Sequence, residues 1–271
     1  MAEQGPTLRL RLLSALALVP IALAVVAAGG WIYVLGVALL VTLMAREWRR
    51  LSEACFGRRY SRLAGATTLV VGLGATTIAA LGRPREAVLC VLIGVTLASV
   101  GAWARGAAAM WAGIGVALIG LPAVALVWLR SVPELGLGVL LWLLIVVWTT
   151  DTAAYAVGRR VGGPRLAPSI SPGKTWSGLG GGVIGASLAG AITLWALGSE
   201  RLVHAAGLGA AFAVLAQLGD LAESALKRRA GVKDSGSLIP GHGGVLDRVD
   251  GFLLTAPVLA LLLGSRAWQW P

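Results

Sequence analysis

Apolar segments long enough to cross a membrane recur along the whole sequence. Hydrophobic residues make up 57% of the 271 residues and charged residues only 13%, whereas soluble domains contain about 25% charged residues. A helix needs roughly 20 apolar residues to cross the hydrocarbon core of a bilayer. The sequence therefore predicts an all-α, polytopic integral membrane protein with about nine transmembrane helices. We place them near 11–29, 31–45, 63–81, 86–104, 107–128, 135–155, 178–198, 202–226 and 251–267.

The first span has an alternative interpretation. Arg9 and Arg11 precede an apolar run that ends in small residues, as in a secretory signal peptide. The run is long, however, and further spans follow directly. We therefore expect an uncleaved first helix.

The basic residues are distributed unevenly between the two sides of the predicted spans. With the N-terminus inside, 18 of the 23 Lys and Arg residues fall in cytoplasmic segments and five outside. This asymmetry predicts a cytoplasmic N-terminus, and it places the segments 156–177 and 227–250 on the cytoplasmic face. The net charge of +11 lies in short loops between spans, which suits anionic headgroups and phosphate ligands and not nucleic acid.

The chemistry is concentrated in the second half of the chain. We expect a single membrane domain over residues 1–271, in which 1–134 form mainly structural helices and 135–271 form the catalytic helices and cytoplasmic loops. The segment 217–250 holds four of the five aspartates and a dense group of cations. Ionisable groups are costly in a membrane protein unless they serve a charged ligand or pair with one another.

Asp220, Glu223, Ser224 and Lys227 fall on one stripe of a helix with 3.6 residues per turn. Such a stripe would be costly against lipid, so we expect it to face a polar cavity. Glu223 and Lys227 have the spacing of a purely structural ion pair, which is an alternative for those two residues. Asp220 lies deeper in the span and has no cation in the preceding turn, which favours a functional role.

A glycine-rich loop follows this helix and leads to the last span. Its glycines would let backbone N–H groups approach phosphate oxygens. His242 could contact phosphate or take part in proton transfer. The alternative is that it is an ordinary loop residue. Asp247 and Asp250 could both cap the start of the last helix. Alternatively, Asp247 could bind Mg²⁺ together with Asp220.

The segment 150–178 forms a second group of polar residues. Asp151 ends a long span, and an irregular loop rich in Gly and Pro follows. Ser171, Lys174 and Thr175 then stand directly before the next helix, where an anion site is expected. A simple capped helix start is the alternative. A Walker A loop is excluded, because position 168 is a proline.

Two sets of residues stand out in these groups. In the first group they are Ser224, Lys227, Arg228, Lys233, Asp234, Pro240, His242, Gly243, Gly244, Asp247, Arg248 and Asp250. In the second group they are the SPGKT residues Ser171 to Thr175 with Asp151, Ala154, Tyr155 and Gly158. Both sets resemble one family, the phosphatidate cytidylyltransferases or CDP-diacylglycerol synthases. The resemblance covers roughly residues 145–262 and is specific, since about a dozen residues match within one short segment. Family members often have Glu at the position of Ser177, so this chain lacks a carboxylate there.

The resemblance implies that CTP and phosphatidic acid react to give CDP-diacylglycerol and pyrophosphate. It also implies Mg²⁺, a second cation such as K⁺, and a homodimer in the cytoplasmic membrane. We assign Asp220, Asp247, Lys227, Arg248, Ser224 and Asp250 to catalysis, with Asp220 and Asp247 as metal ligands. To substrate binding we assign Asp151, Ser171, Pro172, Lys174, Thr175, Arg228, Lys233, Asp234, His242, Gly243 and Gly244.

Two other functions stay open at this point. A related enzyme would transfer the cytidylyl group to another phosphorylated membrane lipid. An ion-coupled transporter would also need ionisable residues within its spans, but at the membrane midplane rather than at one face.

Overall fold

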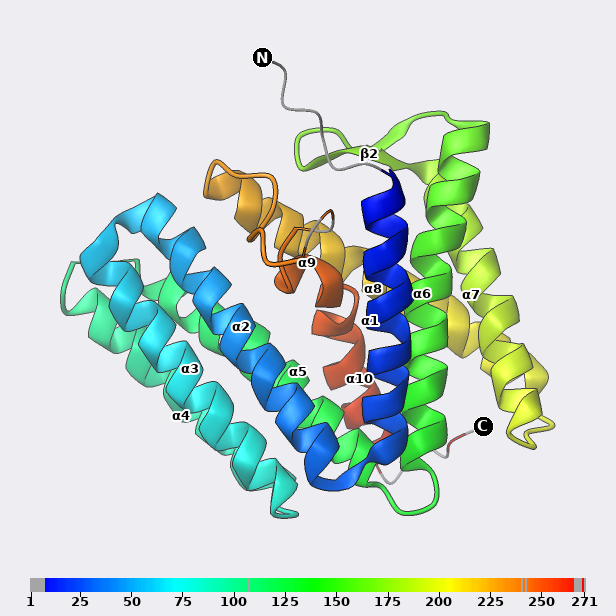
Figure 1. Cartoon of the computed structure of the whole chain (residues 1–271), viewed down its shortest axis with the longest axis horizontal. Coiled ribbons are helices and arrows are strands. Elements are labelled where there is room, and N and C mark those ends of the chain that lie inside the picture. The colour runs from blue at the N-terminus through cyan, green and yellow to red at the C-terminus, as the bar shows by residue number, and fades with distance from the viewer. Residues whose placement is uncertain (1–7, 107, 240, 242, 266–269, 271) are drawn as a thin grey trace. The chain divides into compact units, whose positions relative to one another are not determined.

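A computed structural model describes residues 8–106, 108–239, 241, 243–265 and 270. These residues are largely helical (Figure 1). The first helices are α1 (Leu8–Ala28), α2 (Gly30–Phe56), α3 (Arg58–Ala80), α4 (Pro84–Trp103) and α5 (Ala109–Ser131). They are followed by α6 (Gly136–Val161), the strands β1 (Arg165–Ala167) and β2 (Ser171–Thr175), α7 (Trp176–Ala196), α8 (Leu202–Arg229), α9 (Leu246–Val249) and α10 (Phe252–Gly264).

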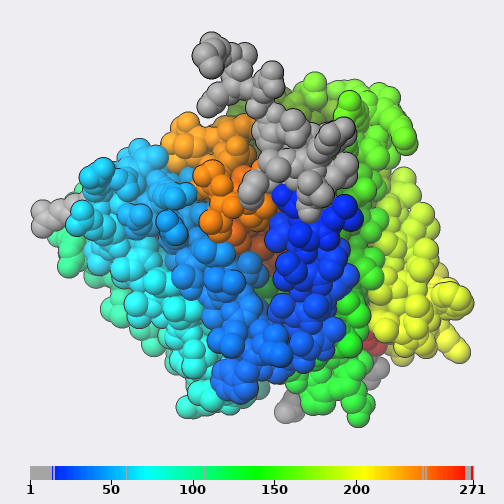
Figure 2. Space-filling view, viewed as in Figure 1, coloured from blue at the N-terminus to red at the C-terminus, as the bar shows by residue number. Residues whose placement is uncertain are grey.

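Seven helices among the described residues, α2 to α8, are long and apolar enough to cross a membrane. The apolar part of α1 that the search covered, Leu16–Ala28, and helix α10 are shorter. The helices also carry apolar side chains on their surfaces: α2, blue in Figure 2, exposes Trp31, Ile32 and Leu35. Such surfaces suit a lipid environment. The prediction of an all-α polytopic membrane protein is confirmed at this level, and the count of nine spans stays a prediction.

Three local differences from the sequence prediction affect the candidate site. Helix α2 continues to Phe56, well beyond the predicted end at 45, and α6 continues to Val161 instead of 155. Long arginine side chains at helix ends can reach water while the helix continues, so a basic segment does not mark the end of a helix. The third difference is a short antiparallel hairpin, β1 and β2, where we expected an irregular loop.

The described residues group into two compact units. One comprises Met1–Val132 with Lys227–Val249, and the other Pro133–Leu226 with Asp250–Pro271. In the first unit, the rings of Trp48 on α2 and Trp111 on α5 stack with centroids 4.8 Å apart. Trp111 also donates a 2.9 Å hydrogen bond to the Ser52 hydroxyl. These buried contacts fix the part of α2 that carries Glu47.

Close packing of α6 on α7 organises the second unit. A Cβ atom added to Gly178 would lie 2.9 Å from the Ala154 carbonyl oxygen, and one added to Gly182 would lie 3.1 Å from that of Thr150. Small residues thus let the two helices approach closely, as expected in lipid, where association depends on packing. This packing holds β2, which leads directly into α7, beside the end of α6.

Candidate active site

Three residues of the stripe predicted in α8, Asp220, Glu223 and Ser224, belong to the second unit. Asp220 and Ser224 lie one turn apart, and the Ser224 hydroxyl donates a 3.2 Å hydrogen bond to Asp220 Oδ1. Helix geometry brings residues four positions apart onto one face. The stripe therefore forms from the local sequence alone.

The SPGKT segment meets this stripe through Lys174. The Lys174 ammonium lies 2.5 Å from Asp220 Oδ2 and donates a 2.9 Å hydrogen bond to Gln217 Oε1. The Gln217 amide nitrogen in turn donates to Asp151 Oδ1 at 3.3 Å. The structure thus supplies Asp220 with a cation from a distant segment, and it brings together Asp151, Lys174 and Asp220, which we predicted separately.

Three carboxylates gather around the same part of α8. One oxygen each of Asp220, Glu223 and Asp250 lie within 4.8 Å of one another. Gly219 allows this approach, since a Cβ atom at that position would lie 2.6 Å from the Asp250 carbonyl oxygen. Asp250 Oδ1 also accepts a 2.8 Å hydrogen bond from the Gly251 N–H, directly before α10. Clustered carboxylate oxygens are suitable ligands for a hard divalent cation.

Thr175 caps helix α7. Its side-chain oxygen accepts a 3.0 Å hydrogen bond from the Gly178 N–H, which is the usual contact of an N-cap threonine. The capped helix start that we considered as an alternative is therefore correct for Thr175. Ser171 and Pro172 lie earlier in β2, at least partly exposed, and Ser177 donates a hydrogen bond to the Gly162 carbonyl.

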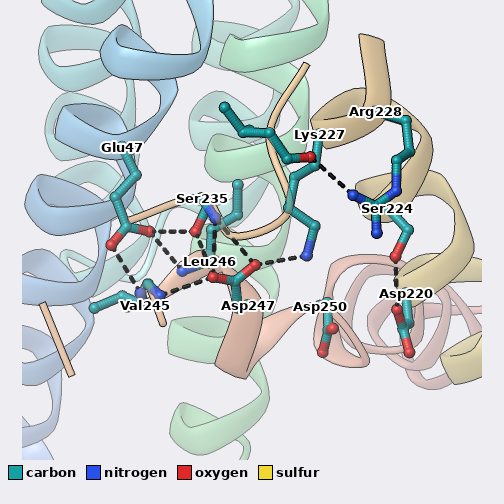
Figure 3. A network of polar contacts seen from close by, with 12 residues as sticks. Glu47, Asp220, Ser224, Lys227, Arg228, Ser235, Val245, Leu246, Asp247 and Asp250 are labelled. Atoms are coloured by element: carbon teal, nitrogen blue, oxygen red, sulfur yellow. Dashed lines mark hydrogen bonds and ion pairs between the residues drawn. The ribbon is translucent and has the colours of Figure 1, made fainter. Parts of the chain in front are cut away.

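A second cluster, in the first unit, surrounds the buried carboxylate of Asp247. Its Oδ1 lies 2.6 Å from the Lys227 ammonium, and its Oδ2 accepts from the N–H groups of Gly244 at 2.7 Å and Ser235 at 3.0 Å. The Ser235 hydroxyl lies 3.0 Å from the same oxygen (Figure 3). The side chains of Lys227 and Asp247 are only 10% and 3% exposed, so they form a buried ion pair.

The environment of Asp247 favours its charged form. Burial raises the pKa of the carboxyl, but the hydrogen bonds from Lys227 and Gly244 and the positive charge of Lys227 lower it by more in total. The pKa therefore lies below its ordinary value of 3.8. Hydrogen bonds and a cation that favour the ionised form have this effect even in a buried position.

The loop before α9 brings these donors to Asp247. Gly243 has a φ of +82°, a left-handed conformation that glycine adopts readily, and a short bridge joins it to Ile239. This turn presents the Gly244 N–H to Asp247. His242 and Pro240, which we predicted or matched in this loop, lie outside the described residues.

Several other predicted residues lie at the surface near this loop. Lys233, Asp234, Arg228 and Arg248 are exposed, and Arg228 donates a hydrogen bond to the Val232 carbonyl at 3.1 Å. Exposed cations next to a buried ion pair are accessible to an anionic ligand.

Three residues of the two clusters were not predicted as site residues from the sequence: Glu47, Gln217 and Ser235. Glu47 belongs to α2, in the half of the chain that we expected to be mainly structural, and the underestimated length of α2 placed it in a basic loop. Gln217 offered a signal that we did not use, a polar amide three residues before Asp220 within an apolar span. Ser235 lies next to the predicted Asp234 but gave no signal of its own.

The structure is that of a helical integral membrane protein with buried and clustered ionisable side chains. Such side chains are typical of membrane proteins that act on charged substrates or ions. The family model described as "Cytidylyltransferase family" matches residues 9–265. The chain belongs to this family.

Named relatives agree with this assignment. A phosphatidate cytidylyltransferase of Brucella suis biovar 1 is 39% identical over 263 residues, which cover 94% of this chain and 92% of the relative. The phosphatidate cytidylyltransferase of Pseudomonas aeruginosa is 39% identical over 286 residues and is matched along 100% of its length, with 97% of this chain. That of Bacillus subtilis is 44% identical over 136 residues, about half of each chain.

Proposed function

We propose that this protein transfers the cytidylyl group of CTP to phosphatidic acid, giving CDP-diacylglycerol and pyrophosphate for phospholipid synthesis. The contact between Lys174 and Asp220 carries the proposal, because it joins the SPGKT segment to the α8 stripe. These are the two segments that resemble phosphatidate cytidylyltransferases, and the relatives with that name match nearly the whole chain.

The reaction joins two anions, so charge neutralisation and positioning are the main tasks. A phosphate oxygen of phosphatidic acid attacks the α-phosphorus of CTP, and pyrophosphate leaves. We assign Lys227, Arg228, Lys233 and Arg248 to neutralising phosphate charge and the 171–175 segment to the nucleotide. The phosphomonoester is largely ionised near pH 7, so the reaction needs no separate base to activate it.

The carboxylates of the second unit fit a magnesium ion. Asp220, Glu223 and Asp250 offer oxygen ligands within 4.8 Å of one another, which is the donor type that Mg²⁺ requires. We propose that Asp220 binds Mg²⁺ with these neighbours, and that the ion neutralises charge on the triphosphate when bound. A metal role for Asp247 stays a prediction, and an ion at its Oδ1 would have to replace the Lys227 ammonium. A second cation such as K⁺ stays a proposal implied by the family resemblance.

The arrangement in the membrane is also proposed. Nine spans with a cytoplasmic N-terminus agree with the excess of Lys and Arg in the segments that would face the cytoplasm. This orientation places the 171–175 and 227–250 segments where CTP is available, in the cytoplasmic (inner) membrane of a bacterial cell. We further propose a homodimer, as the family resemblance implies.

An assay with purified protein tests the function. The protein in detergent is given labelled CTP, Mg²⁺ and either phosphatidic acid or another phosphorylated lipid, such as a polyprenyl phosphate. We expect labelled CDP-diacylglycerol and equimolar pyrophosphate with phosphatidic acid. Label that appears only in another lipid would reject phosphatidic acid as the substrate. No transfer to any lipid would reject the proposed cytidylyl transfer.

A matched pair of variants connects the activity to the site. Asp220→Asn removes the charge that contacts Lys174, and we expect transfer to fall by at least about 100-fold. Glu200→Gln changes an exposed carboxylate between α7 and α8 and is expected to leave transfer unchanged. Equal activity of both variants would exclude the assigned role of Asp220.

A further inference from the structure

Glu47 is a buried carboxylate to which the proposed function assigns no role. It lies on α2 with only 3% of its surface exposed. Its Oε1 accepts a 2.8 Å hydrogen bond from the Val245 N–H, and its Oε2 accepts one of 2.8 Å from the Leu246 N–H (Figure 3). A buried carboxylate is costly unless donors satisfy it. Glu47 therefore holds the backbone directly before Asp247 through two charge-assisted hydrogen bonds.

Two glycines show how closely this segment surrounds Glu47. A Cβ atom on Gly236 would lie 2.7 Å from Glu47 Oε1, and one on Gly244 would lie 2.7 Å from each Glu47 carboxylate oxygen. Contacts of this length do not occur between real atoms of these types. The backbone on both sides of the loop thus approaches the carboxylate to a distance that only glycine permits.

The Ser235 hydroxyl connects Glu47 to Asp247. It lies 3.0 Å from Glu47 Oε2 and 3.0 Å from Asp247 Oδ2, and Ser235 is itself 3% exposed. A hydroxyl has a single proton to donate, so the two carboxylates share one donor, and a change at either carboxylate alters the contact of the hydroxyl with the other. A change at Glu47 is therefore transmitted to the oxygen atoms of Asp247 and to the Lys227 ammonium bound to them.

We propose that Glu47 is a positioning residue for cytidylyl transfer: from the N-terminal half of the chain, it orients the Asp247–Lys227 pair through Ser235 and the 244–246 backbone. This inference rests on the proposed function. We assign no substrate contact to Glu47. Its effect on the reaction arises from the geometry of Asp247 and Lys227, because displacements of about 1 Å in a reacting arrangement reduce turnover by about 100-fold.

Glu47→Gln is the decisive substitution. Glutamine has nearly the same shape, but its amide nitrogen is a donor and would face one of the donors that now contact Glu47. Two donors would then face each other without an acceptor, and a hydrogen bond would be lost. The matched control is Glu53→Gln. Glu53 lies on the same helix and pairs with Arg49 and Arg58 at the surface, and it has no contact with Ser235 or with the 244–246 backbone among those described.

The measurements are kcat and the KM of each substrate, per folded enzyme, together with the melting temperature. For Glu47→Gln we expect kcat to fall about 10- to 100-fold, with both KM values within about twofold, because substrate contacts remain while the pair is misoriented. Glu53→Gln should keep the wild-type kcat. A folded Glu47→Gln protein with wild-type kcat would overturn the proposal, and so would a loss confined to melting temperature.

Ser235→Ala provides an independent test if Glu47→Gln does not fold. This variant removes the hydroxyl but keeps the Ser235 N–H that donates to Asp247. We expect a fall in kcat of about 10-fold, which corresponds to the loss of one hydrogen bond to a charged group, and wild-type kcat would overturn the proposal. If both single variants fold, the double variant should have about the same kcat as the more impaired single variant, because both substitutions act through the same carboxylate.

The outcomes separate this inference from the proposed function. Absence of transfer by the wild-type protein would reject the function itself. Transfer by the wild type together with unchanged kcat in the Glu47 and Ser235 variants would reject only the positioning role.

Discussion

Removing the Lys227 ammonium should destabilise the first unit strongly. Lys227→Met keeps the apolar part of the side chain and leaves the charge of Asp247 buried without its cation. Breaking a buried ion pair in this way costs about 3–5 kcal/mol. Asp247 retains hydrogen bonds from the N–H groups of Ser235 and Gly244, so we expect about 3 kcal/mol, the lower end of that range.

Thermal unfolding in detergent measures this effect. The 11 tryptophans of the chain give a fluorescence signal, and each kcal/mol corresponds to about 2–4 °C for a domain of this size. We therefore expect the melting temperature to fall by about 6–12 °C. Arg228→Met is the control, since Arg228 is the neighbouring cation but is exposed, and exposed pairs contribute about 1 kcal/mol or less. A Lys227→Met protein that melts within about 2 °C of the wild type would refute the buried pair.

The same pair predicts a pH dependence. The pKa of Asp247 is lower in the folded protein than its ordinary value of 3.8. Its contribution to stability is therefore present above that value and is lost as the pH falls through the lower, folded pKa. The difference in melting temperature between wild type and Lys227→Met should be larger at neutral pH than in acid, where Asp247 becomes protonated and its pairing with Lys227 is lost. A difference that persists unchanged in acid would contradict the assignment.

Two further predictions concern the SPGKT segment. Lys174→Ala removes the cation beside Asp220, and we expect the KM for CTP to rise by more than that for phosphatidic acid; an unchanged KM for CTP would count against this segment as the nucleotide contact. Thr175→Ala removes the N-cap of α7 and should cost about 1 kcal/mol of stability, seen as a lower melting temperature, whereas Thr175→Ser keeps the capping oxygen and should be neutral.

The sequence by itself determined the features that depend on local patterns. The length and composition of the apolar runs predicted each membrane-crossing helix to within a few residues at most ends, because a helix in lipid must satisfy its own backbone hydrogen bonds. The spacing of Asp220 and Ser224 predicted their contact on α8, since helix periodicity fixes it. The matching residues in the two polar segments also pointed to the family that the comparisons show.

Tertiary structure decided which distant residues meet. The sequence shows no cation in the turn before Asp220, but Lys174 reaches it from a segment 46 positions earlier in the numbering. Glu47 lies 188 residues before Ser235 in the chain, and no periodicity connects a carboxylate on the second helix with a loop near the C-terminus. Contacts of this kind follow from helix packing and glycine-permitted close approach. For this reason, the sequence predicted the membrane helices and the two groups of polar residues, whereas the support of Asp247 by α2 emerged only from the folded chain.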